Sequence, residues 1–152
     1  MKQLFSIRSA VASDVPGIVA LLEDVDLLTH DVLAPNTQYW VAEDEHQHLV
    51  GVAGVEFGQS AALLRSVAVP TILRNQGLGK QLVQQALDWV LAAGYKRMYL
   101  FSTRSGTYWQ HLGFQRVPVE EVTHSMSAVP QVRRFQAIGK LARETAWYKD
   151  LP

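Results

Sequence analysis

The chain has 152 residues, of which 48% are apolar and 18% are charged, as is typical of a globular domain with a sizeable core. Its 14 Lys and Arg residues balance 14 Asp and Glu residues, and this zero formal charge argues against nucleic acid as a partner. The absence of cysteine excludes disulfides, thiolate nucleophiles and thiolate zinc sites. No apolar run is long enough for a signal peptide or a membrane span. We therefore predict a cytoplasmic protein with no metal and no membrane partner.

The first third of the chain predicts one strand and one helix. A strand is indicated around Ile7, and apolar residues at helical spacing over 15–25 predict a helix whose N-cap is Ser13. Residues 29–37 are predicted to form a short irregular segment, which ends at Pro35 and Asn36.

Three strands follow, separated by short turns. They cover residues 39–43, 48–57 and 61–69, and Pro70 ends the last of them. Strands joined by turns this short predict an antiparallel meander.

The second half alternates helices and strands. The patterns predict a helix over 78–91, a strand over 97–102, a short helix over 105–112, strand-like residues over 114–117, and a helix and a last strand in the tail. No linker or internal repeat is visible, so we expect a single domain over residues 1–152. The order of elements predicts an α/β (α+β) fold, with a mixed sheet and helices on its faces.

The most informative segment, L-L-R-S-V-A-V-P-T-I-L-R-N-Q-G-L-G-K, covers residues 63–80. A strand ends here, a short loop follows, and a helix begins at two glycines. The first turn of a helix carries unpaired N–H groups and a positive dipole end, and glycines let a phosphate approach closely. Arg74 and Lys80 add positive charge. The segment indicates a phosphate-bearing ligand, although its spacing matches neither the Walker A motif nor the dinucleotide fingerprint. The alternative is a strand-to-helix turn that binds nothing.

Two motifs together resemble one family. R-N-Q-G-L-G resembles the R/Q-x-x-G-x-G/A signature with which the GNAT acetyltransferases hold the pyrophosphate of coenzyme A. Y-W-Q-H-L-G-F, over 108–114, resembles the short helix and turn that this family places over the acetyl thioester. The resemblance covers roughly residues 5–117. It implies the GNAT fold, with a largely antiparallel sheet of six to seven strands and helices on both faces, and acetyl-CoA as co-substrate.

The resemblance also implies which residues bind acetyl-CoA. Backbone groups of the strand end would contact the pantetheine arm and the acetyl carbonyl, the loop would surround the pyrophosphate, and one aromatic residue would lie at the thioester end. This set is Val67, Ala68, Val69, Arg74, Asn75, Gln76, Gly77, Leu78, Gly79, Lys80 and Trp109.

Two residues are candidates for proton transfer. Without cysteine, direct attack of an amine on the thioester in a ternary complex is the simplest route. Glu56 is the candidate base, directly or through a water, because it shares a strand face with apolar residues and the family often places Glu on this strand. The alternative is a solvated Glu56, or one paired with Arg65.

Many family members carry a Tyr where this chain has Trp109, so the adjacent Tyr108 is the candidate acid. Core packing of Tyr108 and unassisted departure of the thiolate are the alternatives.

Two arginines are candidates for substrate recognition. The stretches L-L-R-S-V-A-V and S-T-R-S-G-T-Y-W-Q-H-L-G-F-Q-R-V-P are similar to small GNAT proteins of the N-acetylglutamate synthase type and to the arsenic-resistance acetyltransferases. Arg65 and Arg104 would hold a substrate carboxylate, or else be surface or ion-paired residues. The resemblance implies N-acetylation of a small amino acid or a similar amine, and a homodimer is common in the family. Two alternatives stay open: an acyl-CoA sensor without catalysis, and an enzyme that acetylates protein N-termini or lysines.

Overall fold

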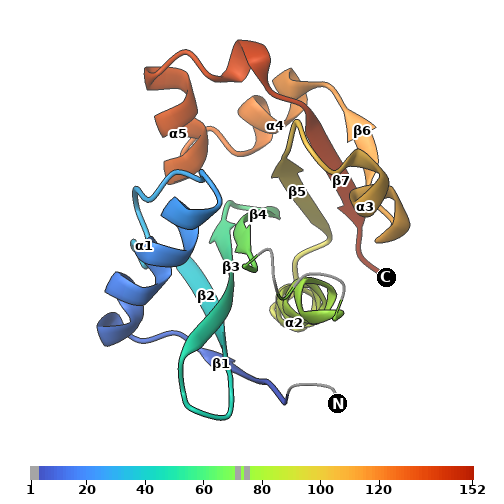
Figure 1. Cartoon of the computed structure of the whole chain (residues 1–152). Coiled ribbons are helices and arrows are strands. Elements are labelled where there is room, and N and C mark those ends of the chain that lie inside the picture. Colours follow the sequence, from blue (N-terminus) through green and yellow to red (C-terminus); the bar gives the residue numbers. More distant parts are fainter. Residues whose placement is uncertain (1–3, 71–72, 74–75) are drawn as a thin grey trace. The chain divides into compact units, whose positions relative to one another are not determined.

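A seven-stranded mixed sheet organises the chain (Figure 1). The computed structural model describes residues 4–70, 73 and 76–152. Its strands are β1 Ser6–Ser9, β2 Thr37–Glu43, β3 Leu49–Phe57, β4 Ala61–Ala68, β5 Arg97–Phe101, β6 Gln115–Val117 and β7 Ala146–Asp150. They are hydrogen-bonded in the order β1-β2-β3-β4-β5-β7-β6. Strand β4 pairs with β5 in parallel, whereas the pairs β1–β2, β5–β7 and β6–β7 are antiparallel. The predicted α/β fold with six to seven strands is confirmed.

Five α-helices accompany the described strands. They are α1 Val15–Asp24, α2 Leu78–Ala92, α3 Gly106–His111, α4 Val119–Ser125 and α5 Pro130–Ala137, with short 3-10 turns η1 Ala12–Asp14 and η3 Leu141–Arg143. The pattern predicted α1, α2 and α3 closely. It missed α4, because V-E-E-V-T-H-S has only two apolar residues and no glycine marks its end, as Gly113 does after α3. The tail helix begins at Pro130, a residue that suits a first helical turn because its missing N–H needs no partner there.

The chain folds as two compact units. The first comprises Met1–Val55 and Ser66–Ala86, and the second comprises Glu56–Arg65 and Leu87–Pro152. Of the three boundaries between the units, two fall inside β3 and β4 and one falls inside α2, so no linker separates the units in sequence. The single domain over 1–152 remains a prediction.

In the first unit, helices cover both faces of the strands. Helix α1 contributes Ile18, Leu21 and Leu22 to an apolar cluster with Tyr39, Val41, Val52 and Ala68. Gly51 precedes Val52 in β3, so the two positions point to opposite faces of the sheet. A Cβ on Gly51 would lie 2.8 Å from Leu82 Cδ1 of α2, so the Leu82 side chain would have to shift to admit any larger residue.

In the second unit, α4 and α5 cover β4, β5 and β7. The cluster comprises Ala61, Leu63, Tyr99, Val122, Met126, Val129, Val132 and Ala146. Each large apolar side chain that it buries contributes about 1.5–3 kcal/mol. At Gly58, a Cβ would lie 2.7 Å from the sulfur of Met126, so the turn between β3 and β4 also fits closely under α4. The segment between β6 and β7 is therefore part of the core.

The start of the first helical segment depends on Asp14 and not on Ser13. The Val11 N–H donates to Asp14 Oδ2 at 2.7 Å, and the Asp14 N–H donates to the Val11 carbonyl at 2.8 Å, which is a reciprocal capping arrangement. Arg8 donates to both carboxylate oxygens of Asp14 at 2.8 Å, and its Nε donates to Glu43 Oε1 at 2.7 Å. The hydrogen bonds from Arg8 lower the pKa of Asp14 from 3.8 to about 2. The predicted Ser13 cap is wrong.

We expect Asp14→Asn to destabilise the fold at neutral pH and much less in acid. The folded pKa lies below the unfolded one, so the contribution is complete above pH 3.8 and is lost as the pH falls towards about 2. The free energy of unfolding at pH 7 should fall by about 1–2 kcal/mol. The loss stays this small because Arg8 is partly exposed and water screens its ion pair with Asp14. Urea unfolding at pH 7 and pH 2.5 measures it, with Asp24→Asn on the surface of α1 as the control. An equal loss at both pH values would contradict the role of the charge.

Candidate functional site

The predicted phosphate-binding loop lies at the start of α2. Gly77 has φ +79°, a left-handed conformation that favours glycine, and the Gln81 N–H closes the first helical turn on its carbonyl at 3.0 Å. Leu78 is 1% exposed and anchors the helix, whereas Gln76, Gly77 and Lys80 are exposed. A Cβ on Gly77 would meet no atom within 4 Å, so there is open space beside the N-terminus. Arg74 and Asn75 lie outside the described residues.

The residues of this loop fit an anionic ligand. The first four N–H groups of a helix lack partners within it, and the helix dipole adds partial positive charge at the same point. The open space at Gly77 lets a phosphate group reach these N–H groups, and Lys80 lies in the first turn. This end of α2 can therefore hold a pyrophosphate through backbone atoms.

The predicted pantetheine-binding residues, Val67, Ala68 and Val69, belong to the same unit as this loop. Strand β4 contains a left-handed residue, Ser66, with φ 59°, which is typical of a β-bulge. Val67 and Ala68 continue the strand beyond Ser66, and Val69 follows its end. Such a bulge interrupts the alternation of faces, so strand period alone does not put Arg65 and Val67 on one face.

Glu56 and Arg65 form a buried ion pair in the second unit. Arg65 Nη1 donates to Glu56 Oε2 at 2.8 Å, and their side chains are 2% and 0% exposed. The other carboxylate oxygen, Oε1, accepts the backbone N–H of Gln131 at 2.8 Å. Both oxygens of the candidate base are therefore hydrogen-bonded. The sequence left open whether Glu56 is solvated or paired with Arg65, and in the structure it is paired with Arg65.

Gln131 was not recognisable in the sequence as part of a site. It is the second residue of α5, and Glu56 supplies the acceptor that the first turn of this helix needs. Its side-chain Oε1 is buried without a hydrogen-bond partner among the described residues. The one sequence feature that could have marked this residue was the Pro130-Gln131 pair at the start of an amphipathic stretch, which is typical of a helix N-terminus.

Tyr108 and Trp109 form an aromatic pair on α3. Their rings are 5.0 Å apart and nearly perpendicular, and Trp109 also packs edge-on against Phe114. The Tyr108 hydroxyl and the Trp109 Nε1 are both buried without a hydrogen-bond partner in the described parts of the chain. Burial raises the pKa of Tyr108 above its usual value near 10, so the hydroxyl keeps its proton at neutral pH. Two adjacent hydrogen-bond donors are thus available to a ligand.

Arg104 lies in an exposed turn before α3. The Ser102 hydroxyl donates to the Arg104 carbonyl, and the indole N–H of Trp147 donates to the Ser102 carbonyl at 3.0 Å. These contacts shape the turn, and the Arg104 side chain extends from it towards solvent. The structure therefore places the two candidate substrate arginines in different settings, with Arg65 buried in an ion pair and Arg104 at the surface.

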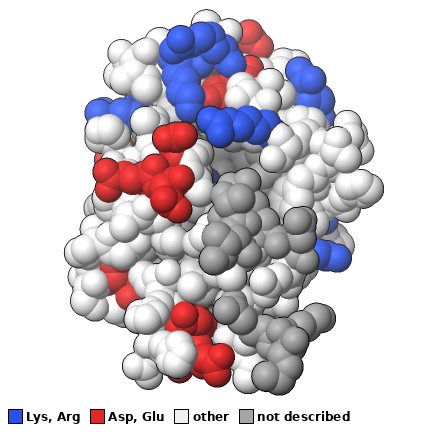
Figure 2. All heavy atoms as spheres, in the orientation of Figure 1, with Lys and Arg blue, Asp and Glu red and all other residues white. Residues whose placement is uncertain are grey.

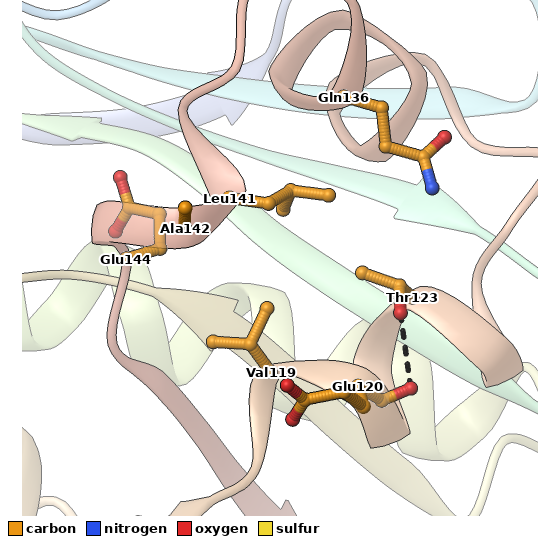
Figure 3. Close-up of a pocket in the computed structure, with 7 residues that line it drawn as sticks. All are labelled: Val119, Glu120, Thr123, Gln136, Leu141, Ala142 and Glu144. Carbon is orange, nitrogen blue, oxygen red and sulfur yellow. Dashed lines mark hydrogen bonds between the residues drawn. The ribbon is translucent and has the colours of Figure 1, made fainter.

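A shallow cavity of about 350 Å³ lies between α4, the end of α5 and η3 (Figure 3). It is lined by Val119, Glu120, Thr123, Gln136, Leu141, Ala142 and Glu144. The Thr123 hydroxyl donates to the Glu120 carbonyl across one turn of α4. None of the predicted site residues lines this cavity.

Positive charge gathers around α5. The stretch from Pro130 to Glu144 carries Arg133, Arg134, Lys140 and Arg143 against one acidic residue. Figure 2 shows Lys and Arg side chains gathered at the end of the view where α5 lies in Figure 1. The neutral chain thus has a locally cationic surface.

Among its described helices, none has the length and apolar composition needed to cross a membrane.

Comparison with curated proteins gives two relatives of the same name. Each is an "Amino-acid acetyltransferase" of Neisseria meningitidis, one from serogroup A and one from serogroup B, and each is 27% identical over 137 residues. The match covers 85% of this chain and 30% of each relative. The chain thus spans less than a third of the length of these relatives.

Solved structures share the fold. N-acetylglutamate synthase from Neisseria gonorrhoeae, complexed with coenzyme A and N-acetyl-glutamate, matches with a TM-score of 0.80 and 21% identity over 100% of this chain and 36% of that chain. Rv2747 from Mycobacterium tuberculosis, in complex with CoA, matches with a TM-score of 0.73 and 19% identity over 97% of this chain and 99% of that chain. The model of the Acetyltransferase (GNAT) family matches residues 7–114, which include the loop before α2 and the aromatic pair of α3. The chain therefore belongs to the GNAT acetyltransferase family.

Proposed function

We propose that this protein is an acetyl-CoA-dependent N-acetyltransferase that acetylates a primary amine of a small molecule, an amino acid or a similar compound. The observation that carries the proposal is the start of α2, where a left-handed Gly77 and open space leave the helix N-terminus accessible to a pyrophosphate. Family membership and the amino-acid acetyltransferases among its relatives support the same reaction. Without cysteine or a membrane-spanning helix among its described residues, the protein suits the cytoplasm.

The donor would be held mainly by backbone groups. The N–H groups of residues 77–80 would bind the pyrophosphate, with charge from Lys80 and Arg74, and the backbone of 67–69 would pair with the pantetheine arm. Bound acetyl-CoA supplies an activated acetyl carbonyl. The Val67 N–H is the candidate donor to the oxygen of that carbonyl as negative charge develops on it.

The acceptor must reach the acetyl carbon as a neutral amine. The nitrogen forms a bond to the carbonyl carbon, the carbon–sulfur bond breaks, one proton leaves nitrogen and one reaches sulfur. An α-amino group has a pKa of about 7.7–8.0 and a lysine about 10.4, so a base helps more with the latter. Glu56 is the candidate base, and it would have to exchange one of its present hydrogen bonds to take a proton.

The leaving sulfur has two candidate donors. Tyr108 keeps its proton at neutral pH and is unpartnered in the described structure, so it can donate to sulfur. The Trp109 indole N–H can donate a hydrogen bond but cannot release a proton usefully. We propose Tyr108 as the acid, with Trp109 beside the thioester. Arg65 and Arg104 are the proposed carboxylate-binding residues.

A non-catalytic acyl-CoA sensor is the second candidate. Two features favour it: Glu56 already has both oxygens hydrogen-bonded, and Trp109 occupies the position where the family resemblance implies a Tyr. A sensor would bind acetyl-CoA tightly and transfer nothing.

Assays of CoA release separate these functions. We expect release of CoA from acetyl-CoA with at least one α-amino acid in a panel of the twenty amino acids, amino-acid-like phosphinates and arsonates, polyamines and short peptides. The rate should rise with pH as the amine loses its proton. Release only with peptides would favour a protein acceptor, and tight acetyl-CoA binding without release would favour the sensor.

Gly77→Asp should abolish acetyl-CoA binding. The carboxylate would lie where the pyrophosphate binds, and we expect the dissociation constant in calorimetry to rise at least about a hundredfold. Gly94→Asp is the matched control, because Gly94 ends the same helix, has φ +95° and also faces open space. It introduces the same charge and backbone strain away from the loop. Equal affinity in the Gly77 variant and the wild type would refute the loop assignment.

Glu56→Gln should lower turnover most at low pH, where the amine is protonated. Loss of a general base costs about a hundredfold or more in rate, and kcat measured between pH 6 and 9 would show it. Thermal unfolding of the Glu56→Gln protein controls for structural damage, because this variant also weakens the ion pair with Arg65. A pH profile parallel to that of the wild type would remove Glu56 as the base.

A further inference from the structure

We infer that the side-chain amide of Gln131 binds the amino group of the acceptor, an inference that rests on the proposed acetyltransferase function and specifies how the acceptor is held. The amide oxygen, Oε1, is buried and has no hydrogen-bond partner among the described residues. The backbone N–H of the same residue donates to Glu56 Oε1 at 2.8 Å. The unsatisfied acceptor therefore belongs to the residue whose backbone N–H is hydrogen-bonded to the candidate base.

An acceptor in this position is costly unless a ligand satisfies it. Buried polar atoms nearly always have partners, and each one without a partner destabilises the folded state. An amide oxygen only accepts hydrogen bonds, so the missing partner is an N–H or O–H donor. The primary amine of the acceptor is such a donor.

The surroundings of Gln131 favour an uncharged amine. Glu56 and Arg65 are both buried and neutralise each other at 2.8 Å, and α5 also carries Arg133 and Arg134, so the charge around Gln131 is neutral to positive. Val129 and Val132, next to Gln131 in the chain, are 3% and 0% exposed and belong to an apolar cluster, which limits water at this position. Such a setting disfavours an ammonium ion and leaves hydrogen bonding as the main means of recognition.

The chemistry of an amide suits this task. An amine must direct its lone pair at the acetyl carbon while its N–H groups point elsewhere. An amide oxygen accepts one N–H without removing the proton, because it is not a base at neutral pH. Gln131 would thus orient the nitrogen, and Glu56 would take the proton from a second N–H. Gln131 is a binding residue in this arrangement, and Glu56 remains the base.

The test compares two glutamines of one helix. Gln131→Met keeps the length and helix propensity of the side chain and removes the amide. We expect the KM for the best acceptor of the panel to rise about tenfold, the KM for acetyl-CoA to stay within twofold, and the Tm to rise because an unpartnered polar atom is gone. Gln136→Met, at an exposed position of α5, should change none of these quantities.

Gln131→Asn provides a second variant that keeps the amide but withdraws it by one methylene, and it should raise the acceptor KM as well. An unchanged acceptor KM in a folded Gln131→Met protein would overturn the inference, and so would a rise in the acetyl-CoA KM alone. In both cases wild-type turnover leaves the acetyltransferase function intact. If the wild type releases no CoA with any amine, the proposed function fails first and this inference fails with it.

Discussion

The second unit depends on one interaction, the buried pair of Glu56 and Arg65 that joins β3, β4 and α5. Burial of two charges costs several kcal/mol each, and their attraction offsets this only when further hydrogen bonds complete the geometry. The N–H of Gln131 supplies such a bond at 2.8 Å, and the dipole of α5 places partial positive charge beside the same carboxylate. Removal of one partner would leave a buried charge and free the start of α5. The candidate acceptor-binding residues therefore depend on this pair.

The two ligands of the proposed reaction would be held in different ways. The loop before α2 would bind the donor through N–H groups and the open space at Gly77, neither of which depends on many particular side chains. Acceptor recognition would depend on individual side chains such as Arg65 and Gln131. We expect the acceptor to vary more than the donor among such proteins.

A buried polar atom without a partner is also informative about function. Gln131 Oε1, the Tyr108 hydroxyl and the Trp109 Nε1 all lack partners within the described residues and all belong to the second unit. Each reduces stability in the absence of a ligand, which is typical of positions kept for binding.

The sequence by itself determined the mixed sheet, the helices α1, α2 and α3, and the loop at Gly77, because strand and helix periods and glycine positions are local properties. It left the state of Glu56 open, and it could not identify Gln131. The hydrogen bond between these two residues joins positions 75 apart in the chain. Whether a polar atom has a partner depends on which distant residues meet it. Only the tertiary structure decided these points, since burial and pairing are properties of the folded chain.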